Sequence, residues 1–186
     1  GFRGIEFGNW VNGAERQKAI NDAFDGLMDL SDVLGISPKA ISLNGELGIG
    51  FGSRGVGGKG AASAHYEAGK VVINLTKKHG KGSLGHEWWH ALDNYFSRMR
   101  GEKGGFISDR PNQYTVKGPD GGYVMDDRVR KEMLDAFKGV VTAINKSELP
   151  ARSKNLDAAR SKVYWSTPLE LTARSFENFL INKLGE

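Results

Sequence analysis

Residues 86–90 read His-Glu-Trp-Trp-His. In a helix, positions i and i+4 lie on one face, so the imidazoles of His86 and His90 can bind one metal ion together. Zinc binds histidine nitrogens at roughly 2.0–2.1 Å. Glu87 stands beside this pair, where it can take a proton from a bound water whose pKa zinc lowers to about 7. The spacing predicts a Zn²⁺ site with Glu87 as general base.

A zinc site of this kind needs a third protein ligand. The chain has no cysteine and four histidines, so the ligand must be a nitrogen or oxygen donor. Phe96 stands six residues after His90, where one subclass of zinc peptidases has its third histidine. We expect Glu170, on a separate helix, to be the third ligand. The alternatives are Glu177, His65 and His79.

Glu170 also has a competing explanation. Residues 167–170 read Thr-Pro-Leu-Glu, the pattern of a capping box at a helix start, in which the glutamate faces water. At this stage the ligand role and the capping role both stay open.

Several other polar residues are candidates for orienting a ligand or contacting substrate. Asp93 follows His90 by three residues, which favours hydrogen bonding that orients a metal ligand, or simple solvation. Arg174 and Glu177 share a helix face with Glu170 and could orient a metal ligand. The candidate donors to an oxyanion are Tyr164, Arg174 and His65.

The motif must sit on a helix, predicted over residues 83–99. Its apolar stripe comprises Leu84, Trp88, Ala91, Leu92, Tyr95 and Met99, and its polar side comprises His86, His90, Asp93 and Ser97. Periodicity and turn residues predict extended chain over 1–12, helix over 14–34, strand over 40–51, a hairpin of 61–66 with 70–75, a glycine-rich surface insertion over 100–124, and helices over 126–145, 156–163 and 168–184. This order predicts an α+β fold with a small mixed sheet and C-terminal helices.

Composition restricts the function classes. Of the 186 residues, 39% are apolar and 26% charged, which indicates a soluble globular protein. The absence of cysteine excludes disulfides and thiol catalysis. The net charge of +4 comes from scattered basic residues, so specific nucleic-acid binding is not expected. No apolar run is long enough to cross a membrane.

The glycines of residues 52–60 lack the Lys-Ser/Thr ending of a phosphate loop and predict a turn or a substrate flap.

The helical HEWWH with a distant glutamate resembles the zincin peptidases of the glutamate-ligand type. The segments GFRGIEFGNWVN, AISLNGELGIGFGSRG, VVINLTKKHGKGSLGHEWWHALDNYF and TPLELTARSFENF together resemble the first large polyvalent-protein-associated domain of phages and mobile elements. The resemblance covers most of the chain.

This resemblance implies a single zincin-like metallopeptidase domain over residues 1–186, cut from a longer polypeptide. It implies a hydrolase that cleaves a protein or peptide substrate in the cytoplasm, including that of a host cell after delivery by a phage. The alternative is a zincin-shaped module that binds proteins without cleaving them. A third possibility, a nucleic-acid-associated domain, would show strongly salt-dependent DNA binding.

Overall fold

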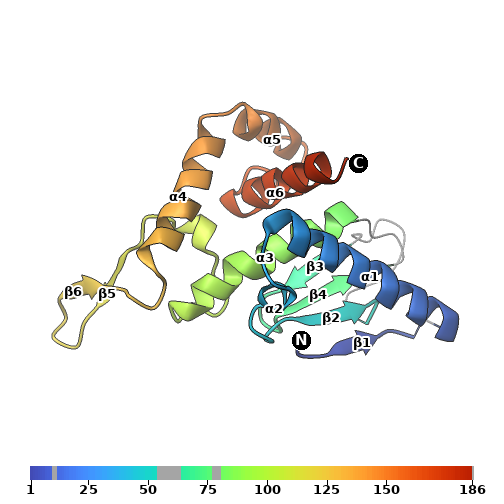
Figure 1. Ribbon diagram of the computed structural model, residues 1–186. Coiled ribbons are helices and arrows are strands. Elements are labelled where there is room, and N and C mark those ends of the chain that lie inside the picture. Colours follow the sequence, from blue (N-terminus) through green and yellow to red (C-terminus); the bar gives the residue numbers. More distant parts are fainter. Residues whose placement is uncertain (10–11, 54–63, 77–80, 186) are drawn as a thin grey trace. The chain divides into compact units, whose positions relative to one another are not determined.

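A computed structural model describes residues 1–9, 12–53, 64–76 and 81–185. They form a four-stranded sheet, a two-stranded sheet and several helices, which is consistent with the α+β class (Figure 1). The strands are β1 (Ile5–Phe7), β2 (Gly48–Phe51), β3 (Ala64–Glu67), β4 (Val72–Leu75), β5 (Thr115–Lys117) and β6 (Tyr123–Met125). The helices are α1 (Gly13–Leu34), α2 (Pro38–Ile41), α3 (Lys81–Met99), the 3-10 turn η1 (Ile107–Asp109), α4 (Lys131–Asn145), α5 (Leu149–Asp157) and α6 (Pro168–Leu184).

The described chain forms two compact units. One comprises Gly1–Leu92 with Phe176–Glu186, and the other comprises Asp93–Ser175. Helices α3 and α6 each contribute residues to both units.

The larger sheet has the order β1-β2-β4-β3. β1, β2 and β4 pair in parallel, and β3 pairs antiparallel with β4. Every residue of β2 and β4 is buried, as expected for central strands covered on both faces. The predicted hairpin and the mixed sheet are confirmed, and β3 occupies an edge position.

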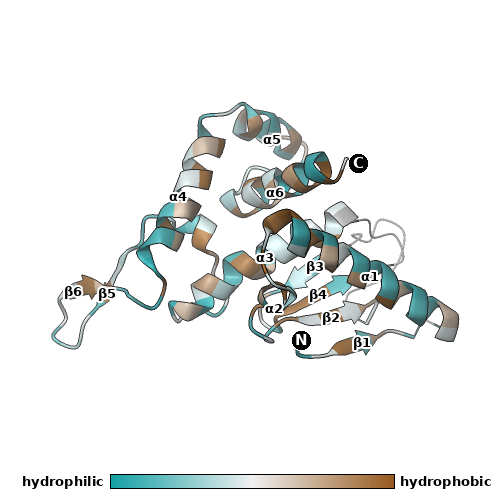
Figure 2. Ribbon diagram, viewed as in Figure 1, coloured by the Kyte–Doolittle hydropathy of each residue, from teal (hydrophilic) through white to brown (hydrophobic). Residues whose placement is uncertain are grey.

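Helix α1 closely matches the range of 14–34 predicted for it. Asn12 and Glu15 form a capping box at its start, and Gly35 ends it with a left-handed φ of 62°. Phe24 is 60% exposed, whereas Ala19, Ala23, Leu27 and Leu30 are buried. A Cβ added at Gly26 would lie 3.0 Å from Leu84, so small residues let α1 approach α3 closely. Figure 2 shows the alternation of hydrophobic and hydrophilic residues along α1.

The expected strand over residues 40–51 is only partly correct. Its first residues belong to α2, which begins at Pro38 with the Ser37 side chain accepting a hydrogen bond from the Ala40 N–H. Left-handed backbone follows at Leu43, Asn44 and Gly45, and the strand starts only at Gly48. A serine followed by proline is a helix-start signal, and here it outweighs the apolar alternation.

Two C-terminal helices also differ from the prediction. Helix α4 begins at Lys131 rather than at 126, because the Asp126 carboxylate accepts hydrogen bonds from the backbone and guanidinium of Arg128. Helix α5 covers Leu149–Asp157 instead of 156–163 and carries a proline in its first turn. Leu156 and Val163, the ends of the predicted range, are both exposed. The range of α6 matches the prediction.

The glycine-rich stretch at 100–124 contains buried and exposed parts. Ile107 and Ser108 are buried, and the Arg100 guanidinium donates to the carbonyls of Arg110 and Gln113. Strand β6 is exposed throughout. Among the described residues, no helix has the length and apolar character needed to cross a bilayer.

Candidate metal centre

Helix α3 carries the HEWWH motif, and its rotation is fixed by its apolar side. The Trp88 indole N–H donates to the carbonyl of Ile41 at 2.9 Å, and the buried Leu84 and Ala91 flank it along the predicted stripe. The stripe weakens at its end, where Met99 is exposed. The polar side of the helix, expected to meet solvent or metal, is buried from His86 to Ser97. Buried polar groups require partners, so this side of α3 must meet other polar groups.

Two imidazoles and one carboxylate converge. Ligand atoms of His86, His90 and Glu170 all lie within 4.8 Å of one another, and each side chain belongs to a buried residue. The Nε2 atoms of the two histidines are 3.1 Å apart. Two nitrogens on one tetrahedral zinc lie roughly 3.3–3.4 Å apart when each bond is about 2.0–2.1 Å. This group could therefore hold a metal ion; imidazole nitrogens and carboxylate oxygens are donors that several divalent metals accept.

Helix α6 supplies the carboxylate. The Thr167 hydroxyl accepts a hydrogen bond from the Glu170 N–H at 3.3 Å, so Thr167 caps the helix as expected. The Thr167 N–H donates to the carbonyl of Tyr164. The Glu170 side chain is only 6% exposed, which is not the solvent-facing carboxylate of an ordinary capping box. Capping by Thr167 and the convergence of Glu170 with the histidines thus coexist.

Glu177 lies about two helical turns beyond Glu170 on α6. Its Oε2 atom is 3.2 Å from Nδ1 of His86, on the ring edge opposite the Nε2 that faces His90. A carboxylate in this position fixes the ring orientation and the tautomer that a metal ligand needs. Phe176, which precedes it, packs against Trp88 and Trp89 with centroid distances of 5.9 and 5.0 Å.

Asp93 has a structural partner. It is fully buried, and its carboxylate accepts hydrogen bonds from the backbone N–H and the hydroxyl of Ser108. This contradicts the solvated alternative, because the residue has no exposed surface. The carboxylate ties η1 to the helix that carries the motif.

Of the remaining candidates, Arg174 contacts a residue of the metal-binding group, and the contacts described for His65 and Tyr164 are with other residues. The Arg174 guanidinium lies 3.4 Å from the Glu170 carboxylate. His65, on the edge strand β3, has its Nε2 3.4 Å from the carboxylate of Glu67. Tyr164 is exposed, and its ring packs edge-on against Trp165. Trp10, His79 and residues 54–63 of the glycine-rich loop and hairpin lie outside the described residues.

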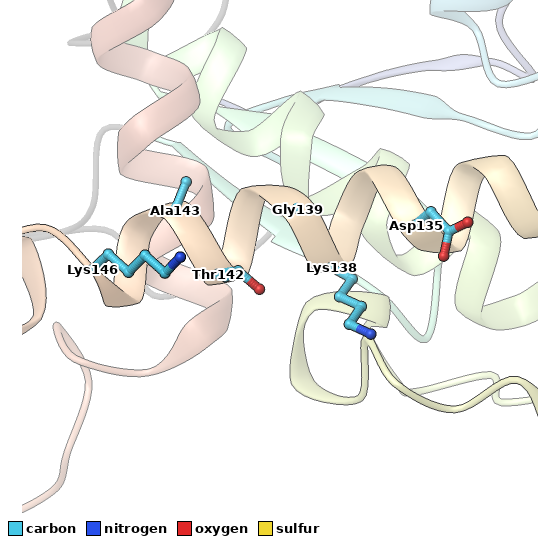
Figure 3. Close-up of a pocket in the computed structure, with 6 residues that line it drawn as sticks. All are labelled: Asp135, Lys138, Gly139, Thr142, Ala143 and Lys146. Carbon is cyan, nitrogen blue, oxygen red and sulfur yellow. The ribbon is translucent and has the colours of Figure 1, made fainter.

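A hollow of about 420 Å³ on the surface does not belong to this centre. All of its lining residues come from the single helix α4: Asp135, Lys138, Gly139, Thr142, Ala143 and Lys146 (Figure 3). No catalytic candidate is among them.

Comparisons with protein families, with curated proteins and with solved structures each found no match.

Proposed function

We propose that this chain is a zinc-dependent peptidase with a zincin-like fold. The observation that carries the proposal is the convergence of His86, His90 and Glu170, whose ligand atoms lie within 4.8 Å of one another. The site shares its helix with a buried glutamate, Glu87, next to the first histidine. The order of a long helix, a mixed sheet with an antiparallel edge strand and then the motif helix also supports a zincin-like fold.

In this proposal His86, His90 and Glu170 would hold zinc, and zinc when bound would supply Lewis-acid chemistry to water and to the substrate carbonyl. Glu87 accepts a proton from the attacking water and passes it to the nitrogen of the leaving amine. Glu177 keeps the His86 ring in the orientation that directs Nε2 toward the metal. The edge strand β3 offers backbone groups to an extended peptide, which would add to the sheet as a further strand.

The substitution Glu87→Gln tests the catalytic part of the proposal. The amide keeps the size of the side chain but cannot accept the proton, so we expect zinc to remain bound while turnover of a protein substrate falls by about 10²–10⁴-fold. The matched control is Glu148→Gln, at an exposed position, and it should leave both unchanged.

Full activity in the Glu87→Gln variant would exclude this mechanism. If the wild-type protein binds zinc but cleaves no protein, itself included, the alternative of a zincin-shaped binding module gains support.

A further inference from the structure

A carboxylate clamp precedes helix α6. Asp157, the last residue of α5, accepts hydrogen bonds from three consecutive backbone N–H groups, those of Tyr164, Trp165 and Ser166, each at 2.9 Å. It also accepts from the Ser166 hydroxyl at 2.7 Å. Burial raises the pKa of Asp157, but these four hydrogen bonds outweigh it and lower the pKa to about 2. The clamp therefore fixes the backbone of a segment that has no regular secondary structure.

The clamped segment places an indole beneath a guanidinium. The Cζ atom of Arg174 lies 3.8 Å from the ring centroid of Trp165, a face-on cation–π contact. Tyr164 packs edge-on against the same indole with a centroid distance of 5.3 Å. Stacking on Trp165 restricts the conformations that the flexible Arg174 side chain can adopt.

The stacked guanidinium reaches the candidate metal ligand. The Nη2 atom of Arg174 lies 3.4 Å from Oε2 of Glu170, one turn earlier on α6. The side chain of Arg174 is 27% exposed and that of Glu170 only 6%.

We propose that Asp157 and Trp165 are positioning residues of the metal centre, which hold Arg174 so that its guanidinium orients the carboxylate of Glu170. The inference rests on the proposed metal-binding function. Asp157 and Trp165 lie outside the motif helix, and they would act on the three ligands through Arg174.

Zinc affinity measured by competition with a chromophoric chelator tests the proposal. Arg174→Met and Trp165→Leu should each weaken zinc binding by about 10–100-fold, the usual effect of removing a group that orients a ligand. Trp165→Phe keeps a ring under the guanidinium and should recover most of the affinity. Circular dichroism of each variant establishes that it folds. The matched controls are Phe24→Leu and Arg152→Met, an exposed aromatic residue on α1 and an exposed arginine on α5.

A double-mutant cycle separates positioning from general packing. If Trp165 acts only through Arg174, the double variant should bind zinc about as weakly as Arg174→Met alone. Additive losses, or zinc affinity in Arg174→Met equal to or above that of the wild type, would overturn the proposal. If wild-type protein binds no zinc, the proposed function fails together with the inference. If the wild type binds zinc tightly and Arg174→Met and Trp165→Leu bind it equally well, the positioning role is excluded and the proposed metal site stands.

Discussion

Nδ1 of His86 lies 3.2 Å from Oε2 of Glu177, a residue 91 positions later in the chain. Two glycines of α3 make room for this contact. A Cβ at Gly82 would lie 3.2 Å from the Glu177 carboxylate, and one at Gly85 would lie 2.2 Å from a methyl group of Leu180. Helices α3 and α6 therefore lie close together at the turn that carries the first histidine.

Replacing Glu177 should weaken the metal centre without removing a ligand. Glu177→Ala leaves the Nδ1 of His86 without its carboxylate, and we expect zinc affinity to fall by about 10–100-fold. Titration with zinc in the presence of a competing chelator measures the change. The zinc affinity of Glu177→Gln, which keeps a hydrogen-bond acceptor, should lie between that of the wild type and that of Glu177→Ala. Wild-type affinity in Glu177→Ala would show that the carboxylate does not orient His86.

Gly85→Ala tests the close approach of the two helices. The new methyl group would meet the buried Leu180, which must shift, so we expect a loss of about 1–3 kcal/mol in the free energy of unfolding. Urea denaturation measures it. The matched control is Gly139→Ala in α4, where a Cβ meets open space, and it should stabilise the protein by about 0.5–1 kcal/mol. Equal effects of the two substitutions would contradict the packing described for α3 and α6.

The buried pair of Asp93 and Ser108 should be important for stability. Asp93→Ala leaves the backbone N–H and the hydroxyl of Ser108 without their acceptor, and each buried unsatisfied group costs about 1–3 kcal/mol. We expect a loss of roughly 2–6 kcal/mol in the free energy of unfolding, measured by urea denaturation. Asp127→Ala, at an exposed position, serves as the control. A loss no larger than that of the control would show that the pair does not tie η1 to α3.

Acid should weaken the Asp157 clamp in a defined pH range. The pKa of Asp157 is lowered to about 2 in the folded protein from an ordinary value of 3.8, so the ionised form is the one that stabilises the fold. The contribution of the ionised Asp157 carboxylate to the free energy of unfolding is complete above about pH 4 and is lost as the pH falls toward about 2. The urea midpoint of metal-free wild-type protein should exceed that of Asp157→Ala at pH 5, and this difference should shrink as the pH is lowered to about 2. A difference that stays constant over this range would contradict the clamp.

Part of this architecture could be predicted from the sequence because local signals agree with the fold. Asn12 and Gly35 bound α1, and Pro168 starts α6 at its predicted position. The i, i+4 spacing of His86 and His90 places both on one helix face whatever surrounds them. These features depend on neighbours within one or two turns.

The rest depends on contacts between distant residues. Asp157 lies within residues 156–163, which were predicted to be helical, but its carboxylate instead accepts hydrogen bonds from residues 164–166. No local pattern links Trp165 with Arg174, whose Cζ atom lies 3.8 Å from the Trp165 ring centroid. The sequence identified Glu170 as a ligand candidate but could not decide between capping and convergence with the histidines, because both roles require the same helix start.

Metal content, determined together with zinc affinity, tests the central claim most directly. Protein purified without chelator and equilibrated with zinc should hold one ion per chain. His86→Ala and His90→Ala should lose stoichiometric binding, and Glu170→Ala should bind much more weakly, because each substitution removes one of the three converging ligands. Absence of stoichiometric zinc in the wild type, or binding unchanged in the folded histidine variants, would contradict the account.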